Sequence, residues 1–97
     1  MIAVLTSHWA IMETFQDARI LLDGNGIAQS RAPGFCRRTT LVSLREPTKI
    51  TTLVIWENEE VYEDWRSSPE RVNSMMGAEK LWSREPESER FDFIGST

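Results

Sequence analysis

The chain of 97 residues carries one histidine, His8, and one cysteine, Cys36. This scarcity excludes a disulfide framework within the chain and a zinc site made only of cysteine and histidine. His8 is the one side chain that titrates near pH 7 without a large pKa shift, so histidine-based acid–base chemistry would depend on it. The hydroxyl of Ser7, the residue before it, can hydrogen-bond a substrate. We therefore take Ser7 and His8 as catalytic candidates.

Aromatic side chains are a second resource for binding a small molecule. The chain has four tryptophans, which are Trp9, Trp56, Trp65 and Trp82. Trp65 is predicted on a helix, where its ring either packs in the core or forms a wall for an aromatic substrate, and we take it as a catalytic candidate. Tyr62, on the same helix, points in another direction around the axis and is a substrate-binding candidate. For Trp56, at the end of a predicted strand, we expect packing.

The charges exclude one class of partner. The formal net charge is −4, and residues 57–97 hold eleven acidic side chains against five basic ones. An acidic chain is unsuited to nucleic acid, because binding phosphates requires a basic surface. The pair Arg37-Arg38 is too small a patch to change this. Arg37 is a candidate for contacting an anionic substrate, and the alternative is that both arginines face solvent.

No membrane association is expected. No stretch of the sequence reaches the roughly 20 apolar residues that a membrane-spanning helix needs. The first residues do not combine a basic region with an apolar one, as a secretory leader would. We therefore expect a cytoplasmic protein whose ligand or substrate is a small molecule.

The predicted elements begin with a strand at residues 1–9, which is short, rich in β-branched residues and without helical spacing. Apolar residues at helical spacing then predict a helix from about residue 13. The two glycines of Gly24-Asn25-Gly26 each cost a helix interior about 1 kcal/mol relative to alanine. We therefore expect this helix to break or distort near Gly24.

The second half of the chain continues with a hairpin and more helix. Strands at residues 35–44 and 50–56 are close in sequence and predict an antiparallel hairpin. Asn58 is a suitable N-cap for the helix that follows. Ser68-Pro69 then begins a second helical segment that ends near Gly77.

A last strand at residues 90–94 completes the order β-α-β-β-α-β, which is that of the ferredoxin-like fold. We predict a single α+β domain over residues 1–97, built on a four-stranded antiparallel sheet. Two helical regions cover only one face of such a sheet, yet residues 50–56 carry apolar side chains on both faces. An exposed apolar face is unfavourable in water, so we expect a second copy of the chain to cover it in a homodimer.

Most of the chain also resembles a known protein family. The segments that carry it are the N-terminal strand, the turn Ala32-Pro33-Gly34-Phe35, the strand end Thr52-Leu53-Val54-Ile55-Trp56 and the helical segments Glu57-Asn58-Glu59-Glu60 and Tyr62-Glu63-Asp64-Trp65-Arg66-Ser67-Ser68. The sequence resembles the antibiotic biosynthesis monooxygenase domain, a member of the dimeric α/β-barrel superfamily. The resemblance implies that two sheets pair in a dimeric barrel with one pocket per subunit.

The haem-degrading branch of this family offers one comparison of site residues. There a first-strand asparagine, a helix tryptophan and a helix histidine shape the haem pocket. Trp65 matches the tryptophan, Ser7 stands where the asparagine would be, and Met75 stands where the histidine would be. Two of the three residues differ, which favours a reaction without a cofactor. Met75 is therefore a pocket-lining candidate, and core packing is its alternative.

The cofactor-independent oxygenases of the family let an electron-rich phenolate substrate supply electrons to oxygen. The protein then holds the ring, removes a proton and stabilises the anion. The resemblance implies a cofactor-independent monooxygenase for an aromatic or polyketide-like small molecule, with Phe35 among the substrate-binding residues. Two alternatives stay open, a dimer that binds a small ligand without catalysis and a haem-binding or haem-degrading relative.

Ser7 and His8 cannot both line one pocket, because neighbouring residues of a strand point to opposite faces of the sheet. The resemblance places Ser7 toward the pocket under the helices. It places His8 toward the second subunit, where it would be an interface residue.

Overall fold

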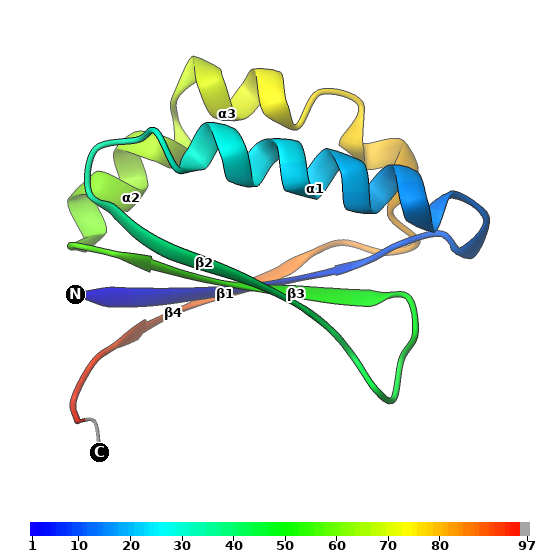
Figure 1. Cartoon of the computed structure of the whole chain (residues 1–97), viewed down its shortest axis with the longest axis horizontal. Helices are drawn as coiled ribbons and strands as arrows, with labels where there is room; N and C mark the ends of the chain where they lie inside the picture. The colour runs from blue at the N-terminus through cyan, green and yellow to red at the C-terminus, as the bar shows by residue number, and fades with distance from the viewer. Residues whose placement is uncertain (96–97) are drawn as a thin grey trace.

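Four strands form one antiparallel sheet, and the helices lie together on one of its faces (Figure 1). The computed structural model describes residues 1–95. The element order confirms the predicted ferredoxin-like α+β fold. The elements are β1 (Ile2–Trp9), η1 (Met12–Thr14), α1 (Phe15–Gln29), β2 (Phe35–Val42), β3 (Lys49–Trp56), α2 (Glu59–Arg66), α3 (Pro69–Ser74), η2 (Ala78–Leu81) and β4 (Glu87–Asp92), where η marks a 3-10 helix.

The spatial order of the strands is β2-β3-β1-β4, so the first and third strands form the centre of the sheet. Val4 of β1 lies opposite Val54 of β3 and opposite Arg90 of β4. Within residues 1–95 the edge strands β2 and β4 do not pair with each other. The sheet of a single chain is therefore open and does not close into a barrel.

The last strand lies earlier in the chain than the predicted residues 90–94. It begins at Glu87, opposite Ser7, and the hydroxyls of Ser88 and Thr6 are hydrogen-bonded at 3.1 Å. It ends at Asp92, opposite Ile2, which is the first residue of β1. Phe93 continues the alternation of Phe91 and Asp92, but β1 begins at Ile2 and offers residues 93–94 no further backbone partner. The pairing strand sets this boundary, and the pattern of one segment cannot reveal it.

The first helix does not break near Gly24 as expected, because α1 is continuous through both glycines. Contacts with neighbouring elements compensate for the low helix propensity of glycine. Nη2 of Arg38 donates a hydrogen bond to the carbonyl of Leu22 at 2.9 Å, and Oγ of Ser74 donates to Oδ1 of Asn25 at 2.7 Å. At Gly26 a Cβ atom would lie 2.7 Å from Nε of Arg38, so the missing side chain makes room for the arginine.

The other helices begin where the caps were predicted. Oδ1 of Asn58 accepts a hydrogen bond from the backbone N–H of Val61, and Oγ of Ser68 accepts one from the N–H of Arg71. The helix after Ser68 is shorter than predicted and ends at Ser74, before the short helix η2. No helix within residues 1–95 is both long and apolar enough to cross a membrane.

The two faces of the sheet have different environments. On β3 every second residue is buried beneath the helices, and the side chains of Ile50 and Trp56 are fully enclosed. The residues between them, including Leu53 and Ile55, are half-buried on the opposite side. This confirms that the sheet carries apolar side chains on both faces. We call the side without helices the open face; its apolar residues include Leu5, Leu41, Leu53, Ile55 and Phe91.

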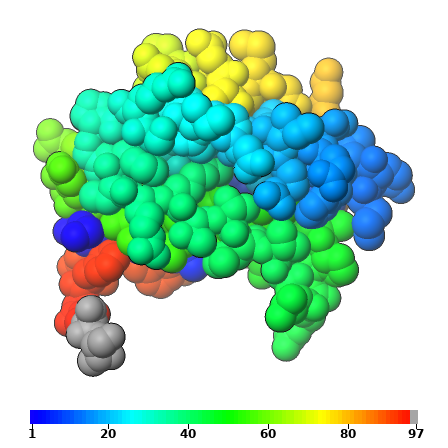
Figure 2. Space-filling view, in the orientation of Figure 1, coloured from blue at the N-terminus to red at the C-terminus, as the bar shows by residue number. Residues whose placement is uncertain are grey.

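Two segments flank the open face. In the space-filling view the turn between β2 and β3, coloured green, projects away from the helices at one end (Figure 2). The end of β4, coloured red, projects in the same direction at the other end. The open face is therefore a shallow concave surface between two arms.

Candidate functional site

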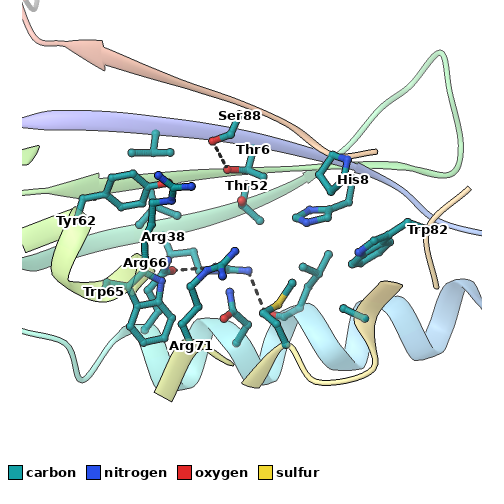
Figure 3. Close-up of a pocket in the computed structure, with 18 of the residues that line it drawn as sticks. Thr6, His8, Arg38, Thr52, Tyr62, Trp65, Arg66, Arg71, Trp82 and Ser88 are labelled. Atoms are coloured by element: carbon teal, nitrogen blue, oxygen red, sulfur yellow. Dashed lines mark hydrogen bonds between the residues drawn. The ribbon is translucent and has the colours of Figure 1, made fainter. Parts of the chain in front are cut away.

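A cavity of about 790 Å³ lies between the sheet and the helices (Figure 3). Strands contribute alternate residues to its floor, because only every second side chain points to this face. On β1 these residues are Val4, Thr6 and His8. Asn25 and Gln29 of α1 lie on the helical side and are buried. Residues 82–86, between η2 and β4, also line the cavity.

Aromatic rings form one end of the cavity, where Figure 3 shows Tyr62 and Trp65 together. The rings of Trp56 and Trp65 are stacked with centroids 6.4 Å apart, and the rings of Trp56 and Tyr62 lie 5.8 Å apart. Tyr62 and Trp65 share the cavity because a spacing of three residues leaves them only about 60° apart around a helix. The expected divergence of Tyr62 from Trp65 is therefore wrong. Trp56 packs in the core, as expected, and also lines the cavity.

His8 lies at the other end of the cavity, beside Trp82 (Figure 3). Its side chain is 7% exposed, and its ring centroid lies 4.4 Å from that of Trp82. Nδ1 of His8 is enclosed and finds no hydrogen-bond partner within residues 1–95. A buried polar atom without a partner is rare in a folded protein, and a catalytic role is one reason for which such an atom is kept.

The pKa of His8 is lowered to about 4, chiefly by burial and also by the positive charges of Arg38 and Arg71. The imidazole is therefore neutral at pH 7. A neutral imidazole can accept a hydrogen bond or a proton from an acidic hydroxyl group.

The expected orientation of Ser7 and His8 is wrong. Ser7 lies on the open face, where its hydroxyl is hydrogen-bonded to Oγ1 of Thr51 at 2.8 Å. His8 lies opposite Ile50, whose side chain is fully buried under the helices. Strand alternation correctly predicts that the two residues point to opposite faces of the sheet. The resemblance to the family strand, however, assigns the wrong residue to the face beneath the helices. The structure brings His8, Tyr62 and Trp65 to one cavity and leaves Ser7 outside it.

On β2 too, the residue that faces the cavity is the neighbour of the predicted one. Arg37 is exposed on the open face opposite Ile55, whereas Arg38 lies opposite Val54 and lines the cavity. Nη1 of Arg38 donates to Oε1 of Gln29 at 2.8 Å, which fixes the guanidinium against α1. Burial lowers the pKa of Arg38 from its usual value, while Asp23 acts in the opposite sense.

The two remaining candidates differ in their positions. Phe35 is half-buried and packs edge-on against Trp56, with ring centroids 5.8 Å apart, but it does not line the cavity. Met75, at the end of α3, lines the cavity and also packs against the apolar cluster around Leu22. Both expected environments of Met75, pocket wall and core, therefore apply.

The polar groups that the helices contribute to the cavity were not predicted from the sequence. Asn25, Gln29 and Arg71 line the cavity, together with Arg38. One signal was present in the sequence, because Leu22, Asn25 and Gln29 recur at helical spacing on the face of α1 that is buried. Polar residues on a buried helix face require partners, which the cavity and Arg38 supply.

Together these groups define the chemistry that the cavity can support. Flat aromatic walls can hold a ring, a neutral imidazole can take a proton, and cationic guanidinium groups can stabilise a negative charge that develops on the ligand.

Solved structures resemble this chain over nearly its whole length. Rv0793 of Mycobacterium tuberculosis superposes with a TM-score of 0.88 at 15% identity, covering 98% of this chain and 96% of that one. SnoaB of Streptomyces nogalater, described as a cofactor-independent oxygenase, gives 0.84 at 13% identity, with 98% and 95% covered. A conserved protein of Methanosarcina mazei gives 0.85 at 17% identity, with 93% and 89% covered. Similarity at this level of identity supports the fold.

The sequence itself supports the family. A comparison with curated proteins gave no match. The family model for antibiotic biosynthesis monooxygenase matches residues 12–73, which span α1, the β2–β3 hairpin, α2 and most of α3. This match covers more than half of the chain and agrees with the fold and with the solved structures. The chain therefore belongs to the antibiotic biosynthesis monooxygenase family.

Proposed function

We propose that this protein is a cofactor-independent monooxygenase that acts on an aromatic or polyketide-like small molecule. The observation that carries the proposal is the enclosed, neutral imidazole of His8 in a cavity walled by Trp65 and Tyr62. The fold similarity to SnoaB, whose description is that of a cofactor-independent oxygenase, agrees with it.

In the proposed reaction the substrate ring packs against Trp65 and Tyr62, and its acidic hydroxyl or methylene group gives a proton to His8. The anion that forms is stabilised by the positive charges of Arg38 and Arg71, the same charges that lower the pKa of His8. Once an anion offsets these charges, one cause of the low pKa of His8 is removed. The proton affinity of the imidazole then rises as the substrate loses its proton.

The substrate anion supplies the electrons that oxygen requires. It transfers one electron to O₂, and the two radicals combine into a carbon-bound hydroperoxide after protonation. Loss of water then leaves a carbonyl group on the same carbon. One oxygen atom enters the product and the other leaves as water, so a methylene group and O₂ become a carbonyl group and water.

Oxygen uptake with anthrone- and quinol-type substrates tests the proposal. We expect turnover that requires O₂, and we expect His8→Gln to lower kcat by about 10²-fold, as removal of an acid–base group does. Ser7→Ala is the matched control, because Ser7 is adjacent in sequence but faces away from the cavity. Its kcat should stay within about twofold of the wild type by the same reasoning.

Absence of oxygen uptake across the substrate panel would refute the oxygenase proposal, and equal turnover by His8→Gln would refute the role of His8 as the base. Binding of these compounds without oxygen uptake would support the alternative of a small-ligand-binding protein. A shift of the Soret band on titration with hemin would instead support haem binding in the cavity.

We also propose that the functional unit is a homodimer. The apolar residues of the open face, which include Leu53 and Ile55, have no covering element within residues 1–95. The turn after β2 and the end of β4 project beyond this face (Figure 2). In the proposed dimer they would contact the second copy from both ends of the face. An identical surface on each copy can pair through a two-fold axis.

A further inference from the structure

The cavity collects positive charge in an acidic protein. Five of the eleven basic side chains line it, whereas the chain as a whole has a net charge of −4. All five are arginines, namely Arg38, Arg66, Arg71, Arg84 and Arg90. Two glutamates, Glu79 and Glu85, also line the cavity, but both are exposed to solvent. Water screens exposed charges far more strongly than half-buried ones.

Three of these arginines already have carboxylate partners. Arg66 pairs with Glu63 at 3.5 Å, and Arg84 pairs with Glu87 at 2.7 Å. Arg90 pairs with Glu59 at 2.9 Å and also with Glu63, and its guanidinium covers the ring of Tyr62. Their charges are therefore largely compensated within the protein.

The other two arginines have no carboxylate partner within residues 1–95. The hydrogen-bond acceptors of Arg38 are neutral, namely Oε1 of Gln29 and the carbonyl of Leu22, and the negative charge of Asp23 acts on Arg38 without forming an ion pair. Arg71 donates no side-chain hydrogen bond to these residues, although it is half-buried at the cavity. A half-buried cation without a directly paired carboxylate is less well stabilised than one in water, so an anionic ligand that pairs with these two arginines would be favoured.

Both guanidinium groups act on the same region of the cavity. Arg38 extends from β2 and Arg71 from α3, so they approach the cavity from the sheet and from the helices. They are the two charges that act on His8 from within the protein. Figure 3 shows Arg38 and Arg71 between the aromatic end at Trp65 and the opposite end at His8.

We propose that the ligand of this cavity is an aromatic carboxylate whose carboxylate binds to Arg38 and Arg71. Guanidinium groups bind carboxylates through short, charge-assisted hydrogen bonds, and within residues 1–95 no acceptor competes for the side-chain donors of Arg71. The aromatic part of the ligand lies against Trp65 and Tyr62. This inference names the substrate class of the proposed oxygenase site. It rests on the proposed function in one respect, which is that this cavity is the functional site.

Binding of two matched, unreactive probes tests the inference. The probes are 2-naphthoate and its neutral amide, 2-naphthamide, titrated calorimetrically into the wild-type protein at pH 7. We expect the carboxylate to bind at least about tenfold more tightly than the amide. Equal affinities, tighter binding of the amide, or no binding of the carboxylate would overturn the inference.

A pair of variants locates the effect. Arg71→Gln removes the free cation, and we expect it to weaken naphthoate binding about tenfold while leaving naphthamide binding unchanged. Arg37→Gln is the matched control, since it removes the same charge from the open face next to Arg38. A naphthoate preference that persists in Arg71→Gln, or that is lost equally in Arg37→Gln, would refute the assignment.

The probes do not depend on catalysis. Preference for naphthoate without any oxygen uptake would refute the oxygenase function and support the carboxylate site. Oxygen uptake with neutral substrates and no preference for naphthoate would support the oxygenase function and refute the carboxylate site.

Discussion

His8 is buried in the cavity wall between Trp82 and two cationic side chains that it cannot pair with. An imidazole in this position is harder to protonate than one in water, for the physical reason that both burial and like charge disfavour the imidazolium ion. The same environment that keeps His8 neutral for accepting a proton therefore makes the fold sensitive to acid.

The stability of the protein should depend on pH through His8. Its pKa falls from 6.5 to about 4 on folding, so between these values the unfolded chain binds a proton that the native protein does not. The contribution of neutral His8 is fully present above pH 6.5 and is lost progressively as the pH falls to about 4. The loss amounts to roughly 3 kcal/mol.

Urea denaturation of the wild type and His8→Gln between pH 7 and pH 4 measures this effect. Carboxylates titrate in both proteins and cancel in the difference between them. As the pH falls from 7 to 4, we expect the free energy of unfolding of the variant to rise relative to that of the wild type by roughly 3 kcal/mol. Parallel pH profiles for the two proteins would show that His8 is not held neutral by the fold.

Single residues of the site were only partly predictable. The alternation that separates Ser7 from His8 and Arg37 from Arg38 is a property of any strand. Which member faces the helices depends on the register, and in β2 a bulge between Phe35 and Arg37 shifts that register. A bulge is a feature of strand pairing and leaves no pattern in one strand, so the sequence analysis chose Arg37 where the cavity has Arg38.

At the scale of elements, α1 shows how tertiary contacts override helix propensity. Gly24 and Gly26 have the same intrinsic cost, and from propensity alone a break was expected. The two positions differ in their surroundings. A Cβ atom at Gly24 would meet nothing within 4 Å, whereas at Gly26 it would meet the side chain of Arg38. By contrast, the capping residues Asn58 and Ser68 act within a few residues and were predicted correctly.

Alanine at the two glycines should therefore have opposite consequences for the site. We expect Gly24→Ala to raise the free energy of unfolding by about 1 kcal/mol, through helix propensity, without changing ligand binding. Gly26→Ala should raise the free energy of unfolding by less or not at all. Its Cβ would lie 2.7 Å from Nε of Arg38, so the arginine side chain would have to move. The displaced arginine should also weaken naphthoate binding.

Urea denaturation and calorimetry on both variants test this pair. Since the two substitutions are chemically identical and lie two residues apart, each controls for the other. Equal stability gains and equal naphthoate affinities would show that Gly26 has no role in placing Arg38.

At the scale of the molecule, the order of elements and the two apolar faces of the sheet were predictable. Each follows from residue patterns within one segment, such as the alternation of residues 50–56. The cavity was less predictable, because it is formed by residues from all four strands, three α-helices, η2 and residues 82–86. No local pattern reports how such distant segments enclose a space.

We expect the assembly of the protein to depend on the open face. Leu53 lies at the centre of this face, opposite Leu5 of β1 and Thr39 of β2. A charge at this position would be stranded in the proposed dimer interface, where it would lose its hydration without gaining a partner. We expect the wild type to sediment at about twice the monomer mass at micromolar concentration and Leu53→Glu to sediment as a monomer.

Ile20→Glu is the matched control for this experiment. Ile20 is an exposed aliphatic residue on α1, on the side of the sheet opposite the open face, with 68% of its surface in solvent. The same substitution there should leave the dimer intact. Far-UV circular dichroism of both variants separates dissociation from unfolding. A monomeric wild type, or a Leu53→Glu variant that remains folded and dimeric, would rule out the open face as the interface.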